Sequence, residues 1–246
     1  MLQIGIMDCS PLSNPAFFSE KIKQVSPQRR DIVECHKTER GKRQSLGGGL
    51  LIQAMLEQAV QQRCAAPYHS FSWKKGEQGK PILLGVTDTK GEPLYVNLSH
   101  SGEMAAAVLA DFEVGIDIQE QQTPPEGVAR RFFTQQEQAW LYATEAMEKA
   151  EHFFRLWTLK EAYIKTTGQG MRTPLMDFDV TKAAEKCGEV IAITEKGWED
   201  KKSEKIFLCA LPTILQPTDP EQHYALAVGG KKLYETPETQ CFLIQH

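Results

Sequence analysis

The stretch FFRLWTLKEAYIK, residues Phe153–Lys165, is typical of a helix with one apolar face. At about 100° per residue, Trp157, Glu161 and Lys165 fall one above another on the face that the helix should bury. A carboxylate there is unusual, because an unpaired buried charge costs several kcal/mol. The ordinary alternative is an i,i+4 Glu–Lys pair at the surface, which stabilises a helix by only about 0.3–0.5 kcal/mol. A functional Glu161 therefore needs a partner elsewhere in the chain.

A second carboxylate with an unusual placement, Asp117, is the candidate for that partner. Residues 114–119 read VGIDIQ and alternate as a half-buried strand does, so Gly115, Asp117 and Gln119 share one face. Two oxygen-bearing side chains at i and i+2 of a strand form half of a site for a hard cation. Mg²⁺ commonly bridges one or two carboxylates to phosphates. The alternative is the solvent face of an edge strand.

The overall composition is that of an ordinary globular chain. Its 246 residues are 41% hydrophobic and 24% charged, enough for one large domain or two of about 110–120 residues. The net charge of −4 gives no general reason to expect nucleic acid or a membrane surface as partner, and no run of about 18 apolar residues occurs. Six scattered cysteines without metal spacing, and an N-terminus without a secretion signal, favour a cytoplasmic protein with reduced thiols.

Positive charge is concentrated near the N-terminus. Residues 21–43 hold eight Lys and Arg against three acidic residues, a local excess of five in an acidic chain. Such a cluster favours a small phosphorylated ligand over a nucleic-acid polymer, and a solvated helix face is the alternative.

Apolar periodicity and capping residues predict a mixture of strands and helices. Strands are expected at residues 2–8, 94–99, 105–110, 114–119, 190–194, 206–211 and 224–228. Helices are expected at residues 17–25, from about 27, 45–62 with Ser45 as cap, 134–142 with a Thr134/Glu137 capping box, and 153–168.

A faint internal repeat suggests two related α+β halves that meet near residue 112. Ile4–Asp8 (IGIMD) resembles Val114–Ile118 (VGIDI) at an offset of 110 residues, and the helix at Arg43 matches the helix at Arg155 at an offset of 112. Chance similarity is the alternative.

Further polar residues lie where phosphate contacts are plausible. Ser99 and His100, in NLSHS, offer donors at a strand end, although a structural histidine or the general base of an acyltransferase are the alternatives for His100. Lys80 lies in GKP, where proline stiffens the chain. Gly47–Gly49 suggest a phosphate cradle at a helix N-terminus. The surrounding sequence does not have the P-loop spacing, which excludes a P-loop nucleotidase.

Five blocks, GKP, NLSHS, VGIDIQ, RRFFTQQE and LWTLKEAYIKTTGQGM, follow one another from Gly79 to Met171. In this order they resemble the 4′-phosphopantetheinyl transferases, specifically the two-domain, surfactin-synthetase-activating type that serves peptide and polyketide synthases. The resemblance implies an α+β fold of two pseudo-twofold-related domains with an intervening cleft for CoA and Mg²⁺. Residues 1–112 would bind the nucleotide and phosphates of CoA, and residues 113–246 would hold Mg²⁺ and the catalytic groups and end in a C-terminal tail.

The resemblance also assigns roles to individual residues. Asp117, Gln119 and Glu161 match the metal-binding positions, Glu161 also matches the proposed base, and Lys165 matches a lysine beside the pyrophosphate, which makes Asp117, Glu161 and Lys165 the predicted catalytic residues. The positions that match or approximate CoA contacts are Arg29, Arg30, Arg43, Lys80, Ser99, His100 and Lys160. Bacterial members commonly read GIDIE where this chain reads GIDIQ. We therefore expect two metal carboxylates in place of three, with weaker or altered metal binding and retained activity.

The expected reaction is transfer of 4′-phosphopantetheine from CoA to a serine hydroxyl of an apo acyl- or peptidyl-carrier protein, with release of adenosine 3′,5′-bisphosphate. We expect a monomer in the cytoplasm, with no nucleic-acid or membrane partner. One alternative is a metal-independent, CoA-dependent acyltransferase with His100 as base. The other is a non-catalytic module that binds CoA or a carrier protein.

Overall fold

A computed structural model of the chain describes residues 1–62, 64–67, 71–76, 81–193, 205–215, 218–232 and 239–242. The chain divides into two compact units. Unit 1 comprises Met1–Asp111, Gln216–Pro220 and Pro237–His246, and unit 2 comprises Phe112–Leu215 and Glu221–Thr236. No helix in the described part of the chain has the length and hydrophobicity of a membrane span.

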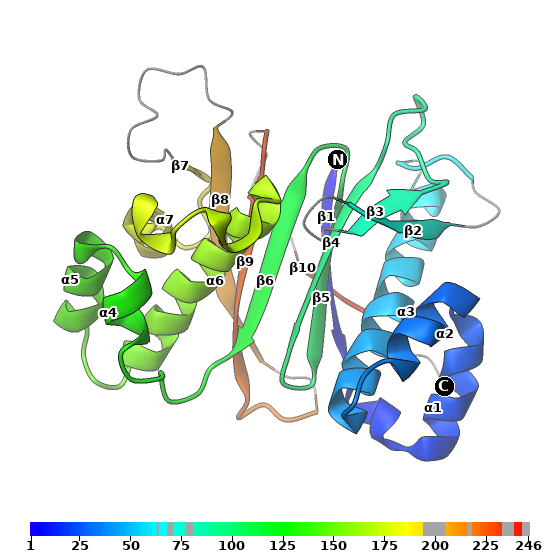
Figure 1. The fold of residues 1–246 in the computed structure, drawn as a ribbon, viewed down its shortest axis with the longest axis horizontal. Helices are drawn as coiled ribbons and strands as arrows, with labels where there is room; N and C mark the ends of the chain where they lie inside the picture. Colours follow the sequence, from blue (N-terminus) through cyan, green and yellow to red (C-terminus); the bar gives the residue numbers. More distant parts are fainter. Residues whose placement is uncertain are drawn as a thin grey trace. The chain divides into compact units, whose positions relative to one another are not determined.

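Unit 1 is built on a four-stranded sheet of order β10-β1-β5-β4, with β2 and β3 forming a separate pair (Figure 1). The bounds are β1 Leu2–Asp8, β2 Ser72–Lys75, β3 Pro81–Leu84, β4 Tyr95–Ser101, β5 Met104–Ala110 and β10 Thr239–Phe242. β5 pairs antiparallel with both β1 and β4, and all of its seven residues are buried. This central position explains its continuous apolar run, since neither face of the strand meets solvent.

Three α-helices accompany this sheet in the described part of unit 1, at Pro15–Lys21 (α1), Pro27–Glu34 (α2) and Glu39–Gln61 (α3). Thr38 caps α3, because its side chain accepts a hydrogen bond from Gly41 N. The apolar stripe of α3 packs on one face of the sheet. The core that results includes Met7, Leu46, Leu51, Met55, Ala107 and Leu109.

The start of α3 differs from the prediction. Ser45 is a buried residue inside the helix, six residues after Glu39, and Gly47–Gly49 follow it within the helix as well. The glycines serve packing, because a Cβ on Gly48 would lie 2.7 Å from Leu98 Cδ2. The predicted phosphate cradle is therefore wrong, since these glycines do not lie at the helix N-terminus.

Unit 2 is built on an antiparallel sheet of order β6-β9-β8-β7, which agrees with the predicted antiparallel strands. Its strands are β6 Val114–Glu120, β7 Ile191–Ile193, β8 Ile206–Leu215 and β9 His223–Gly230. β6 pairs with β9 along its whole length. The edge strand that carries Asp117 is thus firmly held on one side.

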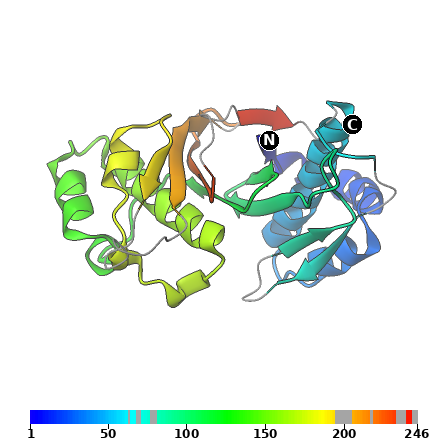
Figure 2. The same ribbon diagram turned by 90° about the horizontal axis from the view of Figure 1, so that it is seen from above.

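The α-helices described in unit 2 are α4 Val128–Phe132, α5 Gln135–Ala143, α6 Lys149–Thr167 and α7 Thr181–Glu185. The predicted capping box at the start of α5 is confirmed, with Thr134 and Glu137 bonding each other's backbone N–H groups. α6 crosses one face of the sheet against β6, β9 and β8 (Figures 1 and 2). It ends at Gly168, whose φ of 68° suits glycine.

The two units share one chain path. Each begins with a strand (β1 or β6), continues through a long helix (α3 or α6), and reaches two antiparallel strands (β4–β5 or β8–β9), the second of which pairs with the first strand. Unit 1 adds β10 after this path. The α+β class is confirmed, and the shared path agrees with the suggested repeat. The twofold relation and the cleft stay predictions.

The C-terminal strand lies outside the half to which the sequence assigns it. Residues Thr239–Phe242 pair in parallel with Ile4–Met7, so this part of the predicted 113–246 half belongs to unit 1. The pairing covers the edge of β1, whose backbone groups would otherwise lack partners on that side. A four-residue strand with no hairpin turn to β1 gives the sequence no signal for this register.

Candidate active site

The site begins with Asp117 on β6, which is only 2% exposed. Alternation along the strand places Gly115, Asp117 and Gln119 on the same face, as predicted. That face meets α6, because a Cβ on Gly115 would lie 2.4 Å from Thr166 N and 2.6 Å from Ala162 O. Glycine is required at this position, and it lets the last turns of α6 lie directly on β6.

This close approach brings Lys165 to Asp117. The Lys165 ammonium donates to Asp117 Oδ1 at 2.7 Å, and the Gln119 amide Nε2 donates to Asp117 Oδ2 at 3.1 Å. The buried carboxylate is therefore held by donors on both oxygens, one from the helix and one from its own strand. Such donors offset the cost of burying a charge.

Glu161 lies one helical turn before Lys165 and is half-buried. Burial is the main cause that raises the pKa of its carboxyl, the negative charge of Asp117 raises it further, and Lys165 opposes both. The charges of Asp117 and Glu161 therefore interact, although the two residues are 44 positions apart in sequence. A carboxyl with a raised pKa, beside a second carboxylate and an ammonium, is suited to accept a proton.

The carboxylate pair fits a hard divalent cation. In the part of the chain that the structure describes, no group of three or more His, Cys, Asp and Glu side chains is arranged to hold a metal. Mg²⁺ does not need such a group, because it keeps several waters and is commonly bound by one or two carboxylates together with substrate phosphates. Asp117 and Glu161 satisfy that smaller requirement.

Aromatic side chains border the site along the same face of α6. Trp157, one turn before Glu161, is half-buried, and its ring lies against Phe132, Phe133 and Phe153 with centroids 5.8 to 6.4 Å apart. These rings explain why the face predicted from FFRLWTLKEAYIK turns toward the interior.

Lys160 lies away from this cluster, and its predicted contact with CoA is wrong. Its side chain is 0% exposed, and its ammonium contacts Glu137 Oε1 at 2.9 Å and donates to Leu175 O at 2.6 Å and Phe178 O at 2.9 Å. These three acceptors leave it no route to a ligand. Lys160 comes one residue before Glu161, which is a rotation of about 100° around the helix axis, so its side chain faces the core.

Glu137, the partner of Lys160, is a residue whose role sequence reasoning missed beyond its place in a capping box. Its other contacts are the backbone N–H groups of Thr134 and Val180, at 2.8 Å each. Burial raises the pKa of Glu137, and Lys160 opposes that rise. The pair ties α5 and the segment after α6 to the helix that carries Glu161.

The predicted basic contacts in unit 1 are largely engaged within that unit. Arg43 donates to Glu103 Oε1 at 2.9 Å, and Arg30 donates to Val25 O and Lys23 O. Arg29 lies with its guanidinium 5.5 Å from the ring centroid of Trp73, and burial lowers its pKa.

The remaining predicted phosphate contacts do not form one set. Ser99 and His100 are neighbours on β4 and point to opposite faces, so Ser99 is buried and His100 is exposed. Lys80 lies outside the described residues.

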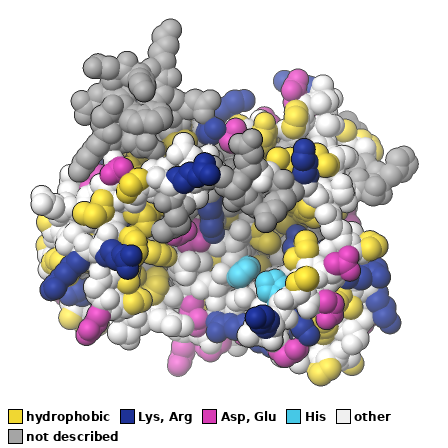
Figure 3. Space-filling view, in the orientation of Figure 1, with side chains coloured by type: hydrophobic (Ala, Val, Ile, Leu, Met, Phe, Trp, Pro, Cys, Tyr) yellow, Lys and Arg dark blue, Asp and Glu magenta, His cyan; other side chains and the backbone are white. Residues whose placement is uncertain are grey.

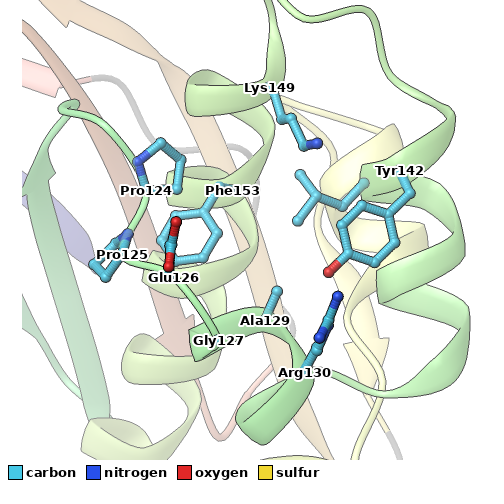
Figure 4. Close-up of a pocket in the computed structure, with 10 residues that line it drawn as sticks. Pro124, Pro125, Glu126, Gly127, Ala129, Arg130, Tyr142, Lys149 and Phe153 are labelled. Atoms are coloured by element: carbon cyan, nitrogen blue, oxygen red, sulfur yellow. The ribbon is translucent and has the colours of Figure 1, made fainter.

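Unit 2 also contains a pocket that the sequence did not predict. It has a volume of about 710 Å³ and lies between the loop before α4, α5 and the start of α6 (Figure 4). Hydrophobic and Lys or Arg side chains lie side by side on the visible face of this unit (left in Figure 3). The lining includes Pro125, Ala129, Arg130, Tyr142, Lys149 and Phe153.

Several known proteins are similar in sequence to this chain. The profile of the 4′-phosphopantetheinyl transferase superfamily matches residues 113–227, which include the whole carboxylate cluster. The 4′-phosphopantetheinyl transferase gsp of Aneurinibacillus migulanus is 30% identical over 158 residues, covering 64% of this chain and 62% of that protein. The transferase psf-1 of Bacillus pumilus is 30% identical over 163 residues, covering 65% and 66%.

Two further comparisons differ in coverage. The L-aminoadipate-semialdehyde dehydrogenase-phosphopantetheinyl transferase of Rattus norvegicus is 25% identical over 235 residues, covering 90% of this chain and 72% of that protein. The holo-[acyl-carrier-protein] synthase structure from Thermotoga maritima is 18% identical, covers 49% of this chain and 64% of that chain, and superposes with a TM-score of only 0.30. The chain thus spans 62% and 66% of the two bacterial relatives. Over residues 113–227 it is similar to the 4′-phosphopantetheinyl transferase superfamily.

Proposed function

We propose that the protein transfers the 4′-phosphopantetheine group of CoA to a serine hydroxyl of an apo acyl- or peptidyl-carrier protein. The observation that carries this proposal is the cluster of Asp117, Glu161 and Lys165, which lies within the residues matched by the superfamily profile. Displacement at a diphosphate needs negative charge neutralised and a hydroxyl deprotonated. The cluster holds groups of both kinds.

In this reaction one phosphorus–oxygen bond forms, one breaks, and one proton leaves the serine hydroxyl. The serine oxygen bonds to the phosphorus that carries pantetheine, and the bond from that phosphorus to the bridging oxygen breaks. The electron pair leaves with the nucleotide as adenosine 3′,5′-bisphosphate. Glu161 accepts the serine proton directly or through water, and its raised pKa favours that acceptance.

The charged side chains of the cluster have complementary roles. Asp117 and Glu161 would hold Mg²⁺, which when bound supplies positive charge at the diphosphate. Lys165 adds a cation that reaches the site from α6. As CoA contacts, the following residues stay predictions: Arg29, Arg30, Arg43, Lys80, Ser99 and His100. In the same proposal the protein is a cytoplasmic monomer that binds neither nucleic acid nor a membrane.

Mass spectrometry of an apo carrier protein incubated with CoA and Mg²⁺ tests the reaction directly. We expect the carrier to gain one phosphopantetheine group on its serine, and to gain nothing when EDTA replaces Mg²⁺. A carrier that gains only the acyl group of an acyl-CoA would favour the acyltransferase instead. That transfer should be lost in His100→Ala and should not depend on the metal that EDTA removes. A carrier that remains unmodified beside bound CoA would favour the non-catalytic binding module.

A further inference from the structure

The contact between Gln119 and Asp117 identifies which end of the Gln119 amide faces the carboxylate. A carboxylate accepts hydrogen bonds and donates none. The contact of 3.1 Å between Gln119 and Asp117 Oδ2 therefore uses the amide N–H of Gln119. The amide carbonyl, which would be the metal ligand, cannot face Asp117 at this distance without repulsion.

The other carboxylate oxygen of Asp117, Oδ1, is bonded by a side chain of α6. Lys165 of α6 donates to Oδ1 at 2.7 Å, while Gln119 acts along β6 from two residues away. Two donors on two different oxygens prevent the carboxylate from turning about its own axis. Asp117 is also 2% exposed, so water competes little for these bonds. Protein groups from two elements therefore hold the orientation of the carboxylate.

A glutamate at position 119 would change this arrangement. It offers only acceptors, so the hydrogen bond to Asp117 would be lost and a second negative charge would lie at close range. The present cluster contains two carboxylates and one ammonium, and the substitution would add a third carboxylate. Such a cluster needs a cation for its stability, whereas the glutamine adds a hydrogen bond and no charge.

We propose that Gln119 is a positioning residue rather than a metal ligand. It holds the Asp117 carboxylate in its binding orientation before the metal enters, and it acts on the metal only through Asp117. This inference rests on the metal-binding role proposed above for Asp117 and Glu161. It replaces the role as a direct ligand that the sequence resemblance suggests for Gln119.

Carbon-13 NMR of the full chain, titrated with Mg²⁺ in the presence of CoA, separates the two roles. We expect the carboxyl carbons of Asp117 and Glu161 to shift while the side-chain carbonyl carbon of Gln119 stays within the spread of the other glutamines. A shift of the Gln119 carbonyl as large as that of Asp117 would overturn the positioning role and leave the proposed function intact. Unshifted carbons at all three residues would overturn the metal site itself.

Thermal unfolding without and with Mg²⁺ provides a second readout that does not depend on activity. In EDTA, Gln119→Glu and Gln119→Met should each lower the unfolding midpoint by about 3–6 °C, because a hydrogen bond to a buried charge is lost. Excess Mg²⁺ should restore Gln119→Glu but not Gln119→Met. Gln136→Glu is the matched control, since it adds the same charge at an exposed position of α5 and should change neither midpoint. Unaltered midpoints of both Gln119 variants in EDTA would overturn the proposal.

Discussion

Unit 1 and unit 2 share a path of strand, long helix and two antiparallel strands, and in unit 2 Lys165 of the helix reaches Asp117 of the first strand. The difference lies in where the glycines are. Both first strands carry a glycine, Gly5 and Gly115, but in unit 1 the helix carries glycines as well, and Gly47 and Gly48 face Cys9 and Leu98. In unit 2 they are on the strands, where Gly115 and Gly229 face the Thr166 end of α6.

Both placements let a helix lie unusually close to a sheet, but they leave different residues available for chemistry. A helix that supplies the glycines has no side chains at the point of closest approach. When the strands supply them, the helix keeps its side chains there, and α6 uses them for Glu161 and Lys165 beside Asp117. The helix of unit 2 thus keeps Glu161 and Lys165 where it meets the sheet, whereas the helix of unit 1 has glycines at its closest contacts.

The largest effect should come from removing the helix carboxylate that distinguishes unit 2. Glu161→Gln should reduce the rate of phosphopantetheine transfer by about 10²–10⁴-fold, because the general base is lost. Rates measured by mass spectrometry with the same carrier protein check this. Glu145→Gln, at an exposed position outside the cluster, is the control and should retain full activity. An unchanged rate in Glu161→Gln would remove Glu161 as the base.

The two units contain ion pairs that differ in burial, so breaking a pair should cost unit 2 more stability than unit 1. Glu137→Gln breaks the fully buried pair with Lys160 and should lower the free energy of unfolding by about 3–5 kcal/mol. Glu103→Gln breaks partly exposed ion pairs with Arg43 and Arg40 and should cost about 1 kcal/mol or less. Denaturant unfolding of both variants measures the difference, and equal losses would contradict the burial argument.

Replacing a single glycine by alanine in each unit tests how closely its helix packs on its sheet. Gly115→Ala should destabilise the protein by about 1–3 kcal/mol, since its new methyl group would meet the backbone at Thr166 and Ala162. Gly48→Ala should cost less, because it meets only the end of the Leu98 side chain, which can rotate away. Chemical denaturation of the pair checks the order, and a larger loss for Gly48→Ala would reverse the account of helix packing.

The smallest effect concerns pH. Glu161 has a pKa raised above its ordinary value of 4.5, so the folded protein holds its proton more tightly than the unfolded chain does. Its contribution to stability is therefore present at low pH and is lost as the pH rises from about 4.5 through the folded pKa. In EDTA, Glu161→Gln should gain stability over the native protein across that rise. Unfolding midpoints measured at a series of pH values check this, and parallel profiles would contradict it.

The central cluster was accessible from the sequence because it depends on two simple periods. The i,i+4 spacing of the helix brings Glu161 and Lys165 to one face, and the i,i+2 spacing of the strand joins Gly115, Asp117 and Gln119. The gap at Gly115 is what turns these faces toward each other. The division of Ser99 and His100 between two faces of β4 follows from the same strand period, although the prediction grouped them.

Other features depend on long-range packing that no local pattern reveals. The ion pair of Lys160 with Glu137 needs the fold to bring α5 beside α6, so Lys160 looked like one more basic residue in a functional motif. The β10 pairing with β1 joins the two ends of the chain. Whether the Gln119 amide turns its N–H or its carbonyl toward Asp117 depends on what faces it, which the sequence alone does not give.

Crystals grown with CoA and Mn²⁺ in place of Mg²⁺ test most directly whether one strand carboxylate and one helix carboxylate share a cation. The anomalous signal of manganese locates the ion independently of any assumed chemistry. We predict a single strong peak within coordination distance of both Asp117 and Glu161, with a phosphate oxygen of CoA completing the contact. A manganese ion bound elsewhere, or touching neither carboxylate, would contradict the account.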